Sequence, residues 1–205
     1  MRMNKIKKKA LIIIDVQNDF MPGGPLGVPG GDEIVASINK KSLDFEYVIA
    51  TQDWHPKDHG SFAINNEDSQ EWELGELGGL PQVMWPVHCV ADSEGAELVK
   101  TLNKEALSKI IYKGTDPKID SYSGFFDNDK KRSTGLGDYL RELSVVEVHI
   151  VGVATDYCVK FTALDAMELG FKVIVHKNCV RGVELNPGDI EKALEEMKAA
   201  GIEIY

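Results

Sequence analysis

Short apolar runs rich in β-branched residues alternate with longer amphipathic stretches along this sequence, and this alternation constrains the fold most. Each run has the length and composition of a strand that is buried on both faces. The runs cover residues 10–14, 47–50, 110–112, 145–153, 172–175 and 202–205. Strands and helices in regular alternation predict an α/β fold, in which a doubly wound, mainly parallel six-stranded sheet carries helices on both faces.

The amphipathic stretches carry the start and stop signals of helices. One helix is expected from Asp32 onward, and a second from Ser93 to Leu102. A third runs from Asp156 to Leu169 and ends before a glycine, which can adopt the left-handed conformation. In the last, from Asn186 to Gly201, the asparagine can cap the helix and the following proline suits its first turn.

Residues 54–92 break this pattern, because they contain no convincing strand or helix. The segment carries all three tryptophans and three of the five histidines. Connections longer than about 12–15 residues are uncommon in compact domains and are often functional. With 205 residues in the chain, we expect one domain over residues 1–205, with a long active-site loop at about 54–92. The alternative is a surface insertion whose aromatic residues are structural.

The net charge limits the classes of partner that this chain can bind, and the cysteine content indicates the cellular compartment. The formal net charge of −10 repels phosphate backbones and anionic lipids, so we expect neither nucleic acid nor membranes as partners. No apolar run approaches the roughly 20 residues of a membrane span. Three widely spaced cysteines suit a reducing cytoplasm, and their odd number leaves at least one thiol free.

Four predicted strands end in side chains that can do chemistry. The first ends in Asp15, the second in Asp53-Trp54-His55, the third in Lys113, and the fourth runs into the segment 152–158, which ends in Cys158. Ligands of open parallel α/β sheets bind outside the carboxyl ends of the strands. A carboxylate, a carboxylate with an imidazole, an amine and a thiol are therefore expected at one edge of the sheet.

Cys158 is expected in the first turn of a helix, where the helix dipole favours a thiolate. Asp15 could accept the thiol proton, and Lys113 could stabilise the thiolate and an anionic intermediate. Each residue also has a simpler interpretation. The cysteine could be a small buried apolar residue, the aspartate a cap, and the lysine a solvated amine.

Asp53 and His55 are two residues apart, so in extended geometry their side chains leave the same face and can share a divalent metal. His88 is the candidate for a third ligand, and His59 competes for that role. The alternative for each loop histidine is an exposed side chain. Two further histidines, His149 and His176, lie in or beside strands and are interpreted as structural.

Six ordered sequence blocks stand out between about Lys9 and Gly182. They are IIIDVQNDF (12–20), ATQDWHPKDHGSF (50–62), WPVHCV (85–90), YKGTDP (112–117), DSYSGFFD (120–127) and GVATDYCV (152–159). Together these blocks closely resemble the nicotinamidase/pyrazinamidase family of isochorismatase-like cysteine hydrolases. The fold that this family implies is the isochorismatase-like hydrolase fold.

The resemblance implies a role for each matching residue. Cys158 resembles the nucleophile, Asp15 the general base and Lys113 the third member of the triad. Ala154 and Cys158 are similar to the backbone donors of the oxyanion hole, and the family has a cis peptide at the bond that matches Val153–Ala154. The remaining sites are three divalent-metal ligands, Asp53, His55 and His88, and four substrate-pocket residues, Phe20, Trp85, Tyr122 and Tyr157. Since the insertion 65–81 is expected to move His59, that residue is left out of the site.

The implied function is hydrolysis of nicotinamide to nicotinate and ammonia, and of pyrazinamide, in NAD salvage. The reaction would pass through a thioester on the cysteine, while one divalent metal ion, most naturally zinc but also iron or manganese, orients the substrate ring. One alternative is another amide hydrolase of the superfamily, of the N-carbamoyl amidohydrolase or isochorismatase type. Another is a non-catalytic nicotinamide-binding protein. The oligomeric state stays open, and a homo-oligomer is compatible with the sequence.

Overall fold

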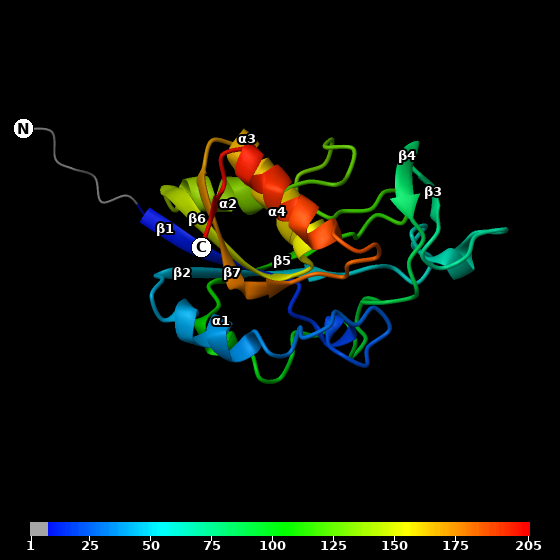
Figure 1. Ribbon diagram of the computed structural model, residues 1–205, viewed down its shortest axis with the longest axis horizontal. Coiled ribbons are helices and arrows are strands. Elements are labelled where there is room, and N and C mark those ends of the chain that lie inside the picture. Colours follow the sequence, from blue (N-terminus) through cyan, green and yellow to red (C-terminus); the bar gives the residue numbers. More distant parts are fainter. Residues whose placement is uncertain (1–7) are drawn as a thin grey trace, which may run out of the picture.

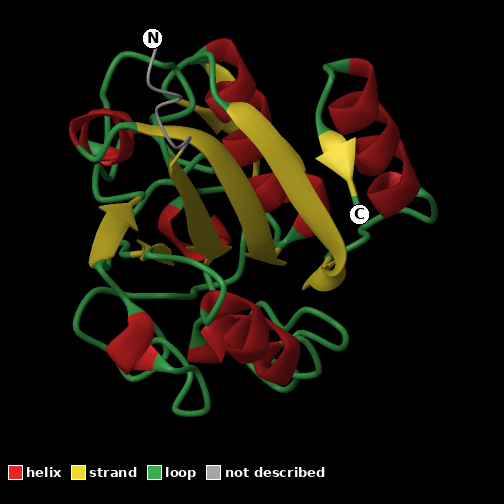
Figure 2. Cartoon of the chain, turned by 90° about the vertical axis from the view of Figure 1, so that its left-hand side faces the viewer, coloured by secondary structure: helices red, strands yellow, loops and turns green. Residues whose placement is uncertain are grey.

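Six parallel strands form the central sheet of the computed structural model, which describes residues 8–205. Their order across the sheet is β5-β2-β1-β6-β7-β8, and every neighbouring pair is parallel. Figure 2 shows the strands side by side with helices around them. The predicted doubly wound α/β fold is confirmed. The strands are β1 (Lys8–Ile14), β2 (Tyr47–Asp53), β5 (Lys109–Lys113), β6 (Val145–Val153), β7 (Lys172–Arg181) and β8 (Glu203–Ile204).

Helices cover both faces of the sheet (Figure 1). On one face α1 (Val35–Ser42) contacts β7, and its Val35 and Ile38 belong to the same core as side chains of β1 and β2. On the other face lie α2 (Leu136–Glu142), α3 (Lys160–Glu168) and α4 (Asp189–Ala199). The side chains of β1 alternate between the two cores, because successive residues of a strand point to opposite faces. No helix in residues 8–205 is long and apolar enough to cross a membrane.

The strand order reverses at the centre of the sheet. From β1 the chain continues outward to β2 and β5, whereas β6, β7 and β8 extend the opposite edge. Such a switch point leaves a crevice outside the carboxyl ends of the two central strands. Asp15 directly follows β1, and the segment that contains Cys158 directly follows β6. The topology therefore places both residues at this crevice.

Two sequence-based expectations about secondary structure are wrong. The segment 54–92 contains an antiparallel hairpin of β3 (Leu74–Leu77) and β4 (Leu80–Val83), which lies beyond the main sheet in Figure 1. The expected helix from Ser93 to Leu102 is a series of turns. Its backbone oxygens at Glu94 and Ala96 accept hydrogen bonds from side chains of other segments, which replace the bonds of a helix.

Helix boundaries also differ from the expected ones. The segment after β6 opens with a π-helical turn, Thr155–Val159, before α3 begins. The last helix, α4, begins at Asp189, since Gly188 before it has a φ of +95° and interrupts the predicted start at Asn186. The predicted helix end before Gly170 is confirmed, because this glycine has a φ of +86°.

Candidate active site

A buried lysine joins the residues at the strand ends. Lys113 closes β5 and is the register partner of Asp53, which closes β2. Its Nζ lies 2.5 Å from Asp53 Oδ1, 3.0 Å from Asp15 Oδ2 and 3.4 Å from Cys158 Sγ. It also donates to the carbonyl of Ser121 at 2.9 Å. We call Asp15, Asp53, Lys113 and Cys158 the strand-end cluster.

Burial and charge together set the protonation of the strand-end cluster. Burial by itself lowers the pKa of Lys113, but the carboxylates of Asp15 and Asp53 outweigh it and hold this pKa well above its ordinary value. Burial raises the pKa of Asp15 to about 6, against the opposing effect of Lys113. The pKa of Asp53 is lowered despite burial, because Lys113 and His55 favour its charged form.

Cys158 is a thiol at rest. Burial raises its pKa well above the ordinary value, and the nearby charge of Lys113 offsets this only in part. The loss of water around the sulfur, which the helix-dipole argument leaves out, disfavours the charged thiolate. The cysteine therefore needs a base. A carboxylate oxygen of Asp15 lies within 4.8 Å of its Sγ.

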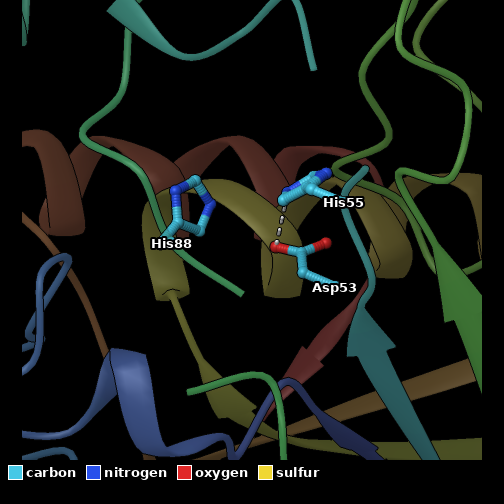
Figure 3. Close-up of side chains that lie close together, drawn as sticks. All are labelled: Asp53, His55 and His88. Carbon is cyan, nitrogen blue, oxygen red and sulfur yellow. Dashed lines mark ion pairs between the residues drawn. The ribbon is translucent and has the colours of Figure 1, made fainter. Parts of the chain in front are cut away.

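A second group, which we call the histidine group, adjoins the strand-end cluster. Asp53, His55 and His88 are buried, and their potential ligand atoms lie within 4.8 Å of one another. Figure 3 shows the three side chains converging, with His55 Nε2 at 3.8 Å from Asp53 Oδ2. Both histidine Nδ1 atoms lie 2.8 Å from backbone carbonyls, of Gly114 and Pro86.

Those two carbonyls fix the tautomers of the histidines. A carbonyl can only accept, so each Nδ1 carries the proton and each Nε2 keeps a free lone pair. Metal-ligating histidines usually have this arrangement. Gly114 is needed for it: its φ is +64°, and a β-carbon there would collide with the ring of His55. The donor set of one carboxylate and two imidazoles fits a divalent transition metal.

His59 lies next to this group, so the expectation that the insertion moves it away is wrong. Its ring centroid is 4.3 Å from that of His55, and its side chain is fully buried. His55, His59 and Asp120 form a further set whose potential ligand atoms lie within 4.8 Å of one another. However, the backbone N–H of Ser61 donates to His59 Nδ1, so in the neutral ring the proton is on Nε2. His59 therefore has the tautomer opposite to that of His55 and His88.

A cavity opens beside the two groups. Its walls include Cys158, Ala154, Asp53, His55 and His88. All four predicted pocket aromatics also line it: Phe20, Trp85, Tyr122 and Tyr157. Asp15 and Lys113 are fully buried and are not among the cavity walls. The peptide bond Val153–Ala154 is cis, as the resemblance implies.

Three of these aromatic residues, Trp85, Tyr122 and Tyr157, contact one another and form one wall of the cavity. The Trp85 ring meets that of Tyr157 edge-on at 5.0 Å, and its indole N–H donates to the Tyr122 hydroxyl at 3.2 Å. From β4, Gln82 donates to Asp120 and lies 2.9 Å from the same hydroxyl, so the hairpin is tied to the cavity. Three cavity residues were missed by the sequence reasoning: Leu26, Asp120 and Val183. Of these three, only Asp120 lies in one of the six sequence blocks, as the first residue of DSYSGFFD.

Residues 9–205 match the isochorismatase domain family. The chain belongs to the isochorismatase family. Among its curated relatives in this family is a protein described as nicotinamidase from Escherichia coli, 48% identical over 202 residues, which cover 96% of this chain and 94% of the relative. These residues include all six blocks of the predicted resemblance.

Solved structures of the same family agree in fold. A structure described as an Acinetobacter baumanii nicotinamidase pyrazinamidase superimposes with a TM-score of 0.94 at 43% identity, covering 98% of this chain and 96% of that one. A Pyrococcus horikoshii pyrazinamidase, solved in complex with zinc, superimposes with a TM-score of 0.78 at 42% identity, covering 97% and 98%. The family resemblance predicted from sequence is thus confirmed.

Proposed function

We propose that this protein hydrolyses nicotinamide to nicotinate and ammonia, and that it also accepts pyrazinamide. The observation that carries the proposal is the position of Cys158. Cys158 lines a cavity with aromatic walls, and the histidine group lines the same cavity. The buried ion pair of Asp15 and Lys113 lies next to its thiol. Relatives described as nicotinamidase or pyrazinamidase cover nearly the whole chain. In cells such an activity belongs to NAD salvage.

In the first half-reaction, the Asp15 carboxylate takes the proton of the Cys158 thiol as sulfur attacks the carboxamide carbon. The resulting oxyanion is held by the backbone N–H groups of Ala154 and Cys158. The tetrahedral intermediate collapses, the C–N bond breaks, and Asp15 returns the proton to the departing nitrogen as ammonia leaves. Lys113 stays charged throughout and stabilises the anionic sulfur.

In the second half-reaction, Asp15 takes a proton from a water molecule that attacks the thioester carbon. The C–S bond breaks, the proton passes from Asp15 to the sulfur, which restores the thiol, and nicotinic acid leaves and loses its proton to solvent as nicotinate. An oxyanion-hole donor contributes roughly 2.7–4 kcal/mol in other hydrolases. Two backbone donors would therefore account for a large part of the rate.

The four pocket aromatics, Phe20, Trp85, Tyr122 and Tyr157, would hold the flat pyridine ring. Asp53, His55 and His88 would hold one divalent metal ion, since they line the cavity and their potential ligand atoms lie within 4.8 Å of one another. When bound, the metal supplies a Lewis-acidic site that orients the ring through its nitrogen. Zinc is our first choice, and iron or manganese would suit the same ligands.

We also propose that the chain forms one domain, in keeping with a family match over residues 9–205. Its three cysteines are free and buried, which suits a cytoplasmic location. The proposed partners are nicotinamide and its analogues, without nucleic acid or membrane. A homo-oligomer is compatible with these proposals, and size-exclusion chromatography with light scattering decides it.

The direct test is ammonia release from nicotinamide by the purified, metal-loaded protein. We expect turnover in the wild type and a loss of about 10⁴-fold or more in Cys158→Ala, in line with nucleophile deletions in other hydrolases. Full activity of that variant would contradict the covalent mechanism. Turnover of N-carbamoyl compounds in place of nicotinamide would favour the related amidohydrolases. Tight nicotinamide binding without turnover would favour a binding protein.

A further inference from the structure

The Thr51 hydroxyl forms two hydrogen bonds with Asp15. Thr51 lies in β2, next to the end of β1 in the sheet. Its Oγ1 accepts the backbone N–H of Asp15 at 3.2 Å and donates its own hydrogen to Asp15 Oδ1 at 2.6 Å. Both residues are fully buried. Bulk water therefore cannot replace either bond if the hydroxyl is removed.

The two bonds leave the oxygens of Asp15 in different states. Oδ1 is occupied by the Thr51 hydroxyl. Oδ2 lies 3.0 Å from Lys113 Nζ as an ion pair, but it is buried and has no aligned hydrogen-bond partner among residues 8–205. The backbone at Asp15 also leaves the strand conformation, with a φ of +50°. Thr51 thus holds one oxygen by a hydrogen bond, while the other faces the Lys113 ammonium and carries no aligned hydrogen bond.

We propose that Thr51 is a positioning residue that holds the Asp15 carboxylate so that Oδ2 is the oxygen that exchanges protons with Cys158. This inference rests on the proposed function, in which Asp15 is the general base. A carboxylate free to rotate in a water-free site would spend part of its time with neither oxygen correctly placed for transfer. Misplacement of this kind lowers a rate steeply even when the reacting groups are all present.

Two other roles for Thr51 make different predictions. If its hydroxyl only weakened Asp15 as a base, removing the hydroxyl would make the carboxylate more basic and Cys158 easier to deprotonate. If Thr51 only filled space, its methyl group, which packs against Gly124, would be the part that matters. Hydroxyl and methyl can be separated, because valine keeps the shape without the hydroxyl and serine keeps the hydroxyl without the methyl.

The experiment compares Thr51→Val and Thr51→Ser with a matched control, Thr162→Val. Thr162 is equally buried, and its hydroxyl accepts the N–H of Gly124 without touching Asp15. For each protein, kcat and KM for nicotinamide and the bound metal are measured. The rate at which iodoacetamide alkylates Cys158 is measured without substrate, and peptide mass mapping identifies the modified cysteine. Circular dichroism checks the fold.

We expect Thr51→Val to lower kcat by roughly 10- to 100-fold, the effect of a hydrogen bond to a charged group, and to leave KM within about twofold. Alkylation of Cys158 should slow as well, while metal content stays unchanged. Thr51→Ser should restore kcat to within about threefold of the wild type, because it keeps the hydroxyl. Thr162→Val should keep the wild-type kcat.

Three results would overturn the proposal: a wild-type kcat in Thr51→Val, equal losses in the valine and serine variants, or Cys158 alkylation in Thr51→Val that is as fast as in the wild type or faster. If the valine variant does not fold, Thr51→Ala takes its place and is judged by the same three results. Failure of the wild type to hydrolyse nicotinamide would instead overturn the proposed function, and the alkylation rates would still report on Thr51.

Discussion

The strand-end cluster and the histidine group share Asp53 but are constructed in different ways. In the cluster, two residues are register partners of adjacent strands, Asp15 directly follows β1, and Cys158 lies in the helical turn after β6. In the histidine group, Asp53 ends a strand, but His55 and His88 belong to the long segment 54–92, and backbone carbonyls orient their rings. The sheet fixes the first group, whereas the path of a loop fixes the second.

This difference suggests a division of labour. We assign bond making and proton transfer to the strand-end cluster, and the holding of a metal and of the substrate ring to the histidine group with the aromatic wall. Asp53 belongs to both, since it pairs with Lys113 and faces His55. Substitutions should therefore fall into two classes, with Asp53 in both.

Asp53→Asn should have the largest effect, because it disturbs both groups at once. Losing the charge leaves Lys113 with only one buried carboxylate, and breaking a buried ion pair typically costs about 3–5 kcal/mol of stability. We expect bound metal to be lost and activity to fall by at least about 10³-fold. Urea unfolding and metal analysis measure the two effects. Retention of metal at wild-type stoichiometry would contradict a shared Asp53.

Asp15→Asn should separate the two groups. An amide cannot accept the thiol proton, so we expect kcat to fall by about 10²- to 10⁴-fold, the usual contribution of general acid–base catalysis. The metal should remain, because Asp15 is outside the histidine group. Ammonia release and metal content are measured on the same sample. Loss of the metal along with activity would show that the two groups are not independent.

His88→Ala should give the opposite pattern. It removes one ligand, and we expect metal affinity to fall by at least about 100-fold, more than most losses of residues that only support a ligand. Alkylation of Cys158 by iodoacetamide should proceed at the wild-type rate, since the strand-end cluster is intact. Metal titration and the alkylation assay test the two halves of this statement. Unchanged metal affinity would remove His88 from the site.

Acid should weaken the strand-end cluster through Asp15. The base must be ionised, and its pKa of about 6 means that protons increasingly occupy it below that pH. We expect kcat/KM to fall with acid below about pH 6, approaching tenfold per pH unit, and to be level above it on this limb. Measuring kcat/KM from pH 5 to 8 tests whether it falls on the acid side as expected. A value of kcat/KM that is constant down to pH 5 would mean that another group is the base.

Lys100→Ala should have the smallest effect and serves as the control for charge removal. Lys100 and its partner Glu94 are both exposed, and Lys100 Nζ lies 3.7 Å from Glu94 Oε1, whereas Lys113 is completely buried. Exposed ion pairs contribute about 0–1 kcal/mol. We expect wild-type activity and a shift in unfolding free energy within that range. A large activity loss would show that this exposed ion pair is coupled to the site.

The fold and the strand-end cluster could be predicted because their signals are local. Apolar runs indicate strands, and parallel strands bring their carboxyl ends to one edge, so Asp15, Asp53, Lys113 and Cys158 could be grouped before their distances were known. The hairpin β3–β4 was missed because Gly75 and Pro81 are unusual within strands.

Other features depend on contacts between distant segments. The segment from Ser93 to Leu102 has the pattern of a helix, yet the side-chain amides of Gln17 and Gln52 donate hydrogen bonds to the carbonyl of Ala96. The length of the insertion 65–81 was the reason to leave His59 out of the predicted site, but loop length does not determine where a loop runs in the fold. The raised pKa of Cys158 follows from complete burial, which a helix-dipole argument from sequence does not include.

The most direct test of the account is the mass of the enzyme caught during turnover. Wild-type protein mixed with nicotinamide and quenched in acid within milliseconds should carry one added nicotinoyl group, located on Cys158 by peptide mapping. The adduct should disappear as substrate is exhausted, and Cys158→Ala should never form it. Steady ammonia release from the wild type with no such adduct, or an adduct on another residue, would contradict the central claim.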